Sequence, residues 1–427
     1  MIAGAAGETG SLSPVSKEIA LSTLAASPLG ASKDSPKRRR TADSGCVRAQ
    51  GIRYDMKATI ERATLLKCLS HVQSVVERRN TIPILSNVLI EAAADGTLKI
   101  MATDLDLQVV ESLSAVSVEV AGAITVSAHL LFDIARKLPD GSQVSLETAD
   151  NRMAVKAGRS RFSLPTLPRD DFPMIVEGDL PTSFELGAAL LAQMIDRTKF
   201  AISTEETRYY LNGIFLHVTD DELRAAATDG HRLARFTIAK PDGADGMPDV
   251  IVPRKCVNEL RKLLEESPSS NVLIDLSASK VRFTLGGENG VVLTSKLIDG
   301  TFPDYNRVIP TGNDKLLKLD PKSFWEGVDR VATIATEKTR AVKMSLENDK
   351  VTLSVTSPDN GTAAEEVPAD YKSAGFEIGF NANYLKDILG QIDGDTVELH
   401  LADAGAPTLI RQDENSPALY VLMPMRV

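Results

Sequence analysis

The chain has 427 residues, enough for two to four domains, and its 43% hydrophobic and 25% charged residues are typical of a globular protein. Three scattered cysteines, Cys46, Cys68 and Cys256, exclude a disulfide framework or a zinc site, and no apolar run reaches the ~20 residues that span a bilayer, so we expect a cytoplasmic protein. The formal net charge of −10 argues against a nucleic-acid-binding surface over the whole molecule, since phosphate-binding domains usually carry a basic excess.

Residues 1–55 differ in composition from the rest of the chain. They are rich in Ala, Gly and Ser, contain the basic run Lys37-Arg38-Arg39-Arg40, and show neither a strand nor a helix period. Such a segment buries too little apolar surface to offset the entropy of ordering it. We expect a disordered leader or a mis-assigned start codon, with a nucleic-acid arm or a localisation signal as the alternative. Structured sequence is predicted from Met56 onward.

From Met56, one arrangement of predicted elements occurs three times. Strand-then-helix pairs are predicted at Lys57–Ile60 with Ala63–Val76, Ser183–Leu186 with Gly187–Phe200, and Leu316–Leu319 with Pro321–Ala335. A second strand, helix, turn and strand follow from Ala123, Asp249 and Phe376. Between them, alternating residues predict hairpins, such as Gly213–Val218 with Leu223–Ala227.

The second set of elements recurs after 126 and then 127 residues. Repeats of this length are whole domains rather than solenoid units. We place their bounds at residues 56–181, 182–311 and 312–427. Each is predicted to be an α+β domain in which two helices pack on antiparallel strands.

The predicted helices are basic although the chain is acidic. Together they contain 12 basic and 6 acidic residues, whereas residues 56–427 contain 40 basic and 53 acidic residues. If the helices share one side of an assembly, they form a positive surface backed by negative strands. For any single helix, a solvated face of mixed sign is the alternative. The windows counted are 63–76, 128–138, 187–200, 253–264, 321–335 and 383–392.

No catalytic constellation is visible in the sequence. The five histidines are scattered, and the phosphate loop, the dinucleotide fingerprint, the nucleophile elbow and H-E-x-x-H are all missing. Asp104 and Asp106 would share one side of a strand, where they could hold Mg²⁺, but no such pair recurs in the other repeats. We expect an ordinary strand end there, with no metal site and no cofactor.

Three segments carry residues suited to binding. Arg208-Tyr209-Tyr210 could stack on unpaired bases, or could be one core and one surface tyrosine beside an arginine. Asp229-Gly230-His231-Arg232-Leu233 is predicted to form a tight turn that presents His and Arg. The end, Tyr420–Val427, contains two Met and several apolar residues, which favours either a packed edge strand or a peptide-binding surface.

Residues 56–427 resemble the β sliding clamp of bacterial DNA polymerase III along essentially their whole length. The similarity lies in TIPILSNVLIE, GRSRFSLPTLPRDDFP, RYYLNG, ATDGHRLA, SKLIDGTFPDYNRVIP and the terminal YVLMPMR. This resemblance implies a non-catalytic processivity factor of three repeated clamp domains, joined head to tail in a homodimeric ring around double-stranded DNA. Helices would face the DNA and sheets would form the outer rim. Residues 1–55 fall outside the resemblance.

The resemblance also implies two sets of binding residues. A hydrophobic cleft between the second and third domains would bind short motifs of the polymerase α subunit, the clamp loader and other partners. Its residues would be Leu211, Thr228, Gly230, His231, Arg232, Leu233, Pro303, Arg307, Val308, Val421, Met423, Pro424, Met425 and Arg426. Contacts to DNA, without sequence specificity, would come from Arg79, Arg208, Tyr209, Tyr210, Arg254 and Lys255.

The implied mechanism is topological. Weak phosphate contacts permit sliding, while a closed ring keeps the tethered polymerase at high effective concentration. The implied location is the bacterial cytoplasm, at the nucleoid during replication. Two other function classes stay open: a repeat-built interaction scaffold that does not bind DNA, which would fit the acidity, and an enzyme whose site the sequence does not reveal.

Overall fold

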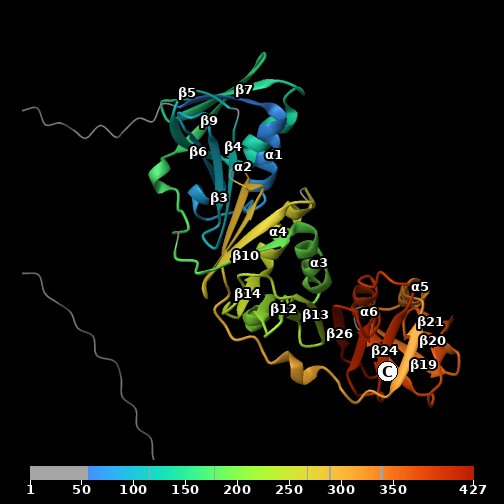
Figure 1. Ribbon diagram of the computed structural model, residues 1–427. Coiled ribbons are helices and arrows are strands. Elements are labelled where there is room, and N and C mark those ends of the chain that lie inside the picture. The colour runs from blue at the N-terminus through green and yellow to red at the C-terminus, as the bar shows by residue number, and fades with distance from the viewer. Residues whose placement is uncertain (1–55, 115, 177, 267, 288–289, 337–339) are drawn as a thin grey trace, which may run out of the picture. The chain divides into compact units, whose positions relative to one another are not determined.

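The computed structural model of the chain describes residues 56–114, 116–176, 178–266, 268–287, 290–336 and 340–427. The predicted leader, residues 1–55, lies outside the described residues. In the described part, helices and strands repeat three times in the predicted order (Figure 1). No described helix is long and apolar enough to cross a membrane.

The first repeat begins with β1 and a helix whose N-terminus is capped by a side chain. Glu61 accepts a hydrogen bond from the Thr64 amide, which satisfies one of the free donors of the first turn of α1. The elements are β1 (Lys57–Glu61), α1 (Arg62–Val72), β2 (Asn87–Ala92), β3 (Leu98–Thr103), β4 (Leu107–Leu113), β5 (Ser117–Val120), β6 (Gly122–Ser127), α2 (Ala128–Lys137), β7 (Gln143–Ala149), β8 (Arg152–Ala157) and β9 (Ser160–Leu167).

In the second repeat, the first strand of the predicted hairpin, Gly213–Val218, has the predicted bounds. Burial alternates along β10 and β16, as is typical of half-buried strands. The elements are β10 (Thr182–Gly187), α3 (Ala188–Lys199), η3 (Glu206–Leu211), β11 (Gly213–Val218), β12 (Glu222–Thr228), β13 (Arg232–Ala239), β14 (Val250–Pro253), α4 (Arg254–Glu265), β15 (Asn271–Leu276), β16 (Lys280–Leu285), β17 (Val291–Lys296) and η5 (Tyr305–Val308).

The third repeat starts its first helix with a strong local signal. Asp320 caps α5 by accepting from the Ser323 amide, and Pro321 occupies the first turn. The elements are β18 (Lys315–Leu319), α5 (Pro321–Ala332), β19 (Ala341–Glu347), β20 (Lys350–Ser357), β21 (Gly361–Pro368), β22 (Asp370–Tyr371), β23 (Glu377–Asn381), α6 (Ala382–Leu389), β24 (Val397–Leu401), β25 (Thr408–Arg411) and β26 (Ala418–Leu422).

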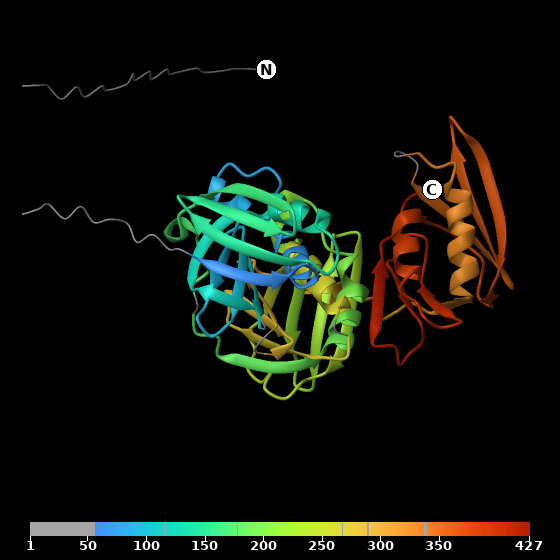
Figure 2. The same cartoon turned by 90° about the horizontal axis from the view of Figure 1, so that it is seen from above.

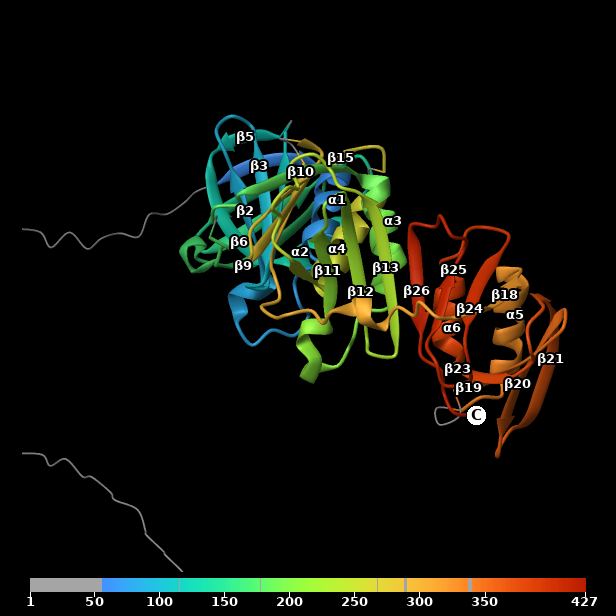
Figure 3. The same cartoon turned by 60° about the horizontal axis from the view of Figure 1, so that its bottom comes forward.

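Strands of neighbouring repeats pair with each other, which the sequence pattern did not predict. The described strands form sheets of 13, nine and four strands. In the largest, β17 of the second repeat pairs antiparallel with β4 of the first, with Leu293 opposite Val109. In the next, β26 pairs with β13, with Tyr420 opposite Ala234 (Figure 3). We call these pairings the first junction (β17–β4) and the second junction (β26–β13).

The two helices of each repeat pack against each other and cover one face of the strands. Figure 2 shows α5 and α6 side by side in this way in the third repeat. The predicted apolar stripe of α4, Val257, Leu260 and Leu264, is buried as expected. Helix α1 ends at Val72, four residues before the predicted end, although Val76 is still buried. We call the strand face turned away from the helices the outer face.

Candidate peptide-docking and DNA-contacting sites

An apolar cluster separate from the main core lies on the outer face of the second junction. Along β13, Ala234 and Phe236 belong to the main core, so Leu233 points to the opposite face. Strand pairing places Leu233 directly opposite Val421 of β26. The buried members of the cluster are Leu211, Ala226, Leu233, Ile251, Phe302, Tyr305 and Val421. Segments from two repeats and their linker therefore share one apolar surface.

Exposed apolar side chains border this cluster. Met423 is 40% exposed, Met425 39% and Val308 49%. Pro303, Arg307 and His231 are also exposed, and Pro424 is half-buried. We call the cluster with this border the docking surface. Of the 14 residues predicted for a peptide cleft, Leu211, Leu233 and Val421 form its floor, and both methionines lie in its border.

The end of the chain is fastened beside the docking surface. The Met423 amide donates to the His231 carbonyl at 2.9 Å, which extends the β26–β13 pairing by one step. The Met425 amide donates to the Gly379 carbonyl at 2.8 Å. A Cβ on Gly379 would collide with Val427, so a glycine is needed where the tail crosses β23. The tail is thus ordered by backbone contacts while its methionine side chains stay exposed.

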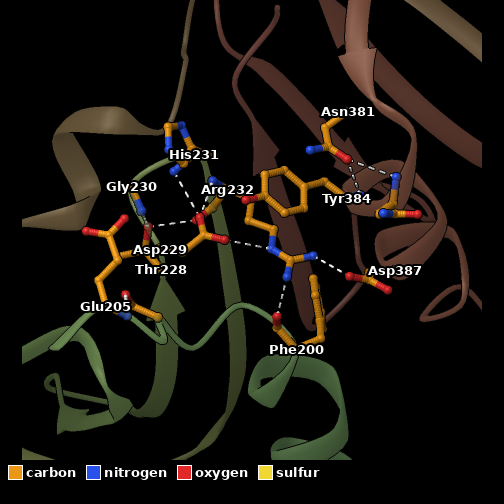
Figure 4. Close-up of polar contacts among 12 residues, drawn as sticks. Phe200, Glu205, Thr228, Asp229, Gly230, His231, Arg232, Asn381, Tyr384 and Asp387 are labelled. Atoms are coloured by element: carbon orange, nitrogen blue, oxygen red, sulfur yellow. Dashed lines mark hydrogen bonds and ion pairs between the residues drawn. The ribbon is translucent and has the colours of Figure 1, made fainter. Parts of the chain in front are cut away.

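The turn predicted within Asp229–Leu233 is present at Gly230, and its hydrogen bonds are internal. Gly230 has a φ of +87°, and the Thr228 hydroxyl donates to the Arg232 carbonyl at 2.6 Å. The Asp229 carboxylate accepts from the amides of His231 and Arg232 (Figure 4). A Cβ on Gly230 would lie 2.5 Å from a guanidinium nitrogen of Arg208. Glycine therefore allows both the turn and the close approach of Arg208.

Arg232 lies on the other side of β13 from the docking surface. Its guanidinium contacts Asp387 of α6 at 2.6 Å and the Phe200 carbonyl at 2.5 Å, and it stacks on the Tyr384 ring at 4.2 Å (Figure 4). The side chain is only 9% exposed. Arg232 therefore holds the second and third repeats together. Its place in the peptide cleft stays a prediction.

The six residues predicted to contact DNA have different surroundings. Arg79 and Arg254 are exposed, and neither side chain has a hydrogen-bond or ion-pair partner among the described residues. Arg208 is paired with Glu205 at 2.5 Å, which raises the pKa of the arginine. Tyr209 is 54% exposed, whereas Tyr210 packs against the apolar cluster of the docking surface.

Lys255 is already engaged by oxygen atoms of the first repeat. Its ammonium pairs with Asp104, donates to the Val75 carbonyl at 3.1 Å, and lies 3.6 Å from Glu77. The Asp104 carboxylate also accepts from the amides of Asp106 and Leu107. Asp104 thus links the first repeat to Lys255 of the second repeat. The described residues contain no group of three potential metal ligands.

His71 is a junction residue that the sequence pattern did not reveal. Its Nδ1 lies 2.8 Å from Glu111 and its Nε2 lies 2.6 Å from Glu266, which follows α4. Burial alone would lower the pKa of His71, but hydrogen bonds to the two carboxylates outweigh it and raise that pKa. The sequence showed only that His71 lies off the apolar stripe. Its partners are 40 and 195 residues away, so no local pattern could identify them.

Family models match all three repeats. The N-terminal domain of the DNA polymerase III β subunit matches residues 56–176, its central domain residues 185–304, and its C-terminal domain residues 306–426. This chain belongs to the DNA polymerase III β subunit family. The resemblance seen in the sequence is confirmed, and with it the fold of three repeated clamp domains.

Relatives of full length support the same conclusion. The beta sliding clamp of Caulobacter vibrioides is 52% identical over 378 residues, and that of Escherichia coli K12 is 37% identical over 374 residues. Each match covers 87% of this chain and 100% of the relative. The protein is therefore a DNA sliding clamp of the replicative polymerase.

Solved clamp structures have the same fold. A sliding clamp from Bartonella birtlesii bound to griselimycin is 51% identical, with a TM-score of 0.85 over 88% of this chain and all of the other. The Caulobacter crescentus clamp, with polyethylene glycol bound to a region described as β-motif tethering, is also 51% identical, with a TM-score of 0.84 over 88% and 100%.

Proposed function

We propose that two copies of this clamp close head to tail into a ring around double-stranded DNA, and that the ring tethers the polymerase without catalysing a reaction. The ring follows from how the repeats pair inside one chain. At both junctions, the last strand of one repeat pairs with the third large strand of the preceding repeat: β17 with β4, and β26 with β13. The matching strands of the remaining pair are β9 and β21.

Strands β9 and β21 both have a side that no described strand fills along most of its length. β21 ends the four-stranded sheet. β9 pairs with β8 throughout, but it meets β6 only at Thr166 and Leu167. Because a strand with free amides and carbonyls is a template for another strand, β9 of one copy and β21 of a second copy are natural partners. Two such contacts, related by a twofold rotation, close a ring.

The charges on these two strands are complementary, and β9 also exposes an aromatic ring. β9 exposes Arg161, and Phe162 is 38% exposed. β21 carries Glu365 and Glu366, which pair with Arg330 and Lys350 within one chain. Opposite charges on adjacent strands favour the pairing and oppose each strand pairing with itself. This match of free strands is the observation that carries the proposal.

DNA would be contacted from the side that the helices cover. Arg254, at the first position of α4, and Arg79 offer unpaired guanidinium groups for phosphates, and phosphate contacts carry no sequence information. The docking surface, on the outer face, would bind motifs of the polymerase α subunit, the clamp loader and other partners. We place the protein in the bacterial cytoplasm, at the nucleoid during replication. The domain bounds 56–181, 182–311 and 312–427 remain predictions.

The ring is tested by charge exchange. Sedimentation of the wild-type protein should give twice the chain mass. Arg161→Glu and Glu366→Arg should each shift the protein toward monomer, and combining them should restore the dimer. Lys372→Glu, which changes an exposed charge away from both strands, should have no effect. A wild-type monomer, or a double variant no better than the singles, would contradict the proposed contact.

Topological binding has its own test. The protein loaded on nicked circular DNA should stay bound at high salt and should leave when the circle is cut. Release from the intact circle would favour the scaffold alternative. Truncation after Leu422, which removes Met423–Val427, should abolish stimulation of processive synthesis and leave the dimer intact. Unimpaired stimulation would disprove the assignment of the docking surface.

A further inference from the structure

A group of basic side chains adjoins the docking surface on the same outer face. Pairing of β12 with β13 sets Thr228 opposite Leu233 and Ala226 opposite Arg235. Since alternate residues share a face, Arg235 lies next to Leu233 along β13, about 7 Å away. Arg224 continues this face on β12, and His217 lies opposite Arg224 on β11. We call His217, Arg224 and Arg235 the basic cluster.

Arg235 has no partner for its charge among the described residues. Its Nε is buried without a hydrogen bond, and so is the neighbouring Thr237 hydroxyl. Burial and the charge of Arg224 both lower the pKa of Arg235. A half-buried cation beside a second cation is unfavourable unless an anion is supplied from elsewhere. Among the described side chains of the docking surface and the basic cluster, Arg235 is the one half-buried cation without a hydrogen-bond or ion-pair partner.

The other two members of the cluster do not neutralise Arg235. Arg224 is paired with Glu222 at 2.6 Å, so that carboxylate is already used. His217 lies 2.7 Å from the Tyr305 hydroxyl, and burial lowers the pKa of the histidine. His217 is therefore neutral at pH 7, although Asp249 acts on it in the opposite direction. The excess positive charge of the site is that of Arg235.

Aromatic rings join the basic cluster to the docking surface. The rings of Phe215 and His217 stack at 4.8 Å, and Phe215 stacks on Phe302 at 4.7 Å. Phe302 and Tyr305 belong to the apolar floor described above. A chain segment that seats an apolar side chain on Leu233 and Val421 thus passes directly to the guanidinium of Arg235. The helices that would face DNA cover the opposite side of these strands, so a phosphate backbone does not reach this cluster.

We propose that the basic cluster binds the carboxylate of an acidic residue in the same partner segment that occupies the docking surface. This proposal rests on the function proposed for that surface. An arginine fork matches a carboxylate with two parallel hydrogen bonds. In an extended segment, residues two positions apart are also about 7 Å apart and share a side. The acidic residue therefore lies two positions from the apolar side chain that contacts Leu233.

Selection of peptides tests this spacing before any natural partner has been identified. Random heptapeptides displayed on phage would be selected on the whole wild-type clamp, on Arg235→Gln and on Val421→Asp. The wild type should enrich peptides with Asp or Glu two positions from a large apolar residue. Arg235→Gln should keep the apolar preference and lose the acidic one. Val421→Asp should lose the apolar preference, and if it does not, the docking surface itself is wrongly assigned.

Affinity measurements then isolate the contact. A selected peptide and its Glu→Gln version would be titrated against each clamp, with the melting temperature as the check on folding. The wild type should bind the Glu peptide roughly tenfold more tightly, and Arg235→Gln should bind both equally. Arg282→Gln, which changes an arginine paired with Asp275 between β15 and β16 of the second repeat, should keep the tenfold preference.

Arg235→Lys provides a second variant. It keeps the charge and loses the fork, so we expect an intermediate preference that decreases as salt is raised. No preference for Glu in the wild type, or an undiminished preference in Arg235→Gln, would overturn the proposal. Because Val421→Asp reports on the docking surface alone, failure of the basic cluster and failure of the docking surface give different results.

Discussion

The first and second junctions pair their strands in the same way, yet different charged groups cross them. At the first junction, His71 bridges to Glu266 and Lys255 pairs with Asp104. At the second, two arginines cross: Arg232 to Asp387, and Arg197 to Asp393. Arginine stays charged at all accessible pH values, whereas histidine does not. The first junction therefore includes a buried histidine ion pair whose contribution changes with pH, whereas the ion pairs named at the second junction are made by arginine.

The outer faces of the two junctions differ in polarity. The positions that match Leu233 and Val421 of the second junction are Gln108 and Thr294 at the first. The Gln108 side chain accepts a hydrogen bond from the Ile175 amide at 2.9 Å, which fastens the linker across the strands. At the second junction an apolar pair replaces this polar pair and leaves surface for a partner. There the linker packs Phe302 and Tyr305 into the apolar cluster instead of crossing the strand pair by a hydrogen bond to a polar side chain.

Giving the second junction the outer-face side chains of the first should have the largest effect, which is on polymerase affinity. Leu233→Gln combined with Val421→Thr gives the second junction the side chains of the first. Loss of two apolar contacts of roughly 1.5–3 kcal/mol each predicts at least a ~100-fold loss of polymerase affinity. Backbone pairing of β13 with β26 should survive, and hydrogen exchange of the amides in β26 checks it. Unchanged affinity would mean that the polarity of this pair does not decide where partners bind.

Removing the arginine of the second junction should have the next largest effect. Arg232→Ala leaves the Phe200 carbonyl, the 14%-exposed carboxylate of Asp229 and the 46%-exposed carboxylate of Asp387 without their partner. We expect the local free energy of opening to fall by about 3 kcal/mol, measured as faster hydrogen exchange in β13 and β26. Arg136→Ala, which removes an exposed pair on α2, is the control and should change exchange little. Equal effects would show that Arg232 is not a junction residue.

The pH dependence of the first junction should be smaller. Because the pKa of His71 is raised by folding, its stabilisation is complete below the unfolded value of about 6.5 and is lost as pH rises through the higher folded value. Exchange in β4 and β17 should therefore quicken as pH rises from 6 to 9. Exchange must first be corrected for its intrinsic pH dependence. His71→Gln should remove this trend, while β26 should not show it.

The smallest predicted effect separates two adjacent basic residues. Arg254→Ala should lower the salt dependence of DNA binding by about one counterion, since its guanidinium is free for phosphate. Lys255→Ala should change that slope less and should instead quicken exchange at the first junction, where its ammonium is engaged. Filter binding over a salt series measures the slope. The opposite ranking would mean that Lys255 leaves Asp104 when DNA is bound.

Local patterns in the sequence predicted local structure well. Strand β11 was predicted with both ends correct because Gly213 follows a turn and its residues alternate. The Asp229-Gly230 turn was predicted from turn chemistry alone. The same alternation rule places Arg232 and Leu233 on opposite faces of β13, which the predicted cleft did not take into account.

Long-range contacts were beyond the reach of these patterns. Pairing of β17 with β4 joins residues far apart in sequence, and nothing in either strand specifies its partner. His71 looked like a solvated helix residue because both of its carboxylates come from distant elements. No sequence pattern marked Arg235, because its charge is unpaired only when one knows which carboxylates its neighbours in the fold already use. The ring and the place of the tail in the peptide cleft were predicted only from the resemblance to sliding clamps.

The free side of β9 also bears on how a single copy survives before assembly. The Thr166 amide donates to Asn151 on the β8 side, so the ring nitrogen of Pro165, one residue earlier, faces the unfilled side. A proline there cannot donate to an incoming strand, and Arg161 repels another copy of itself. Newly made chains are thereby protected against indiscriminate sheet extension and aggregation. Under the proposed ring, the same eight-residue strand would carry both the dimer contact and the features that disfavour mispairing.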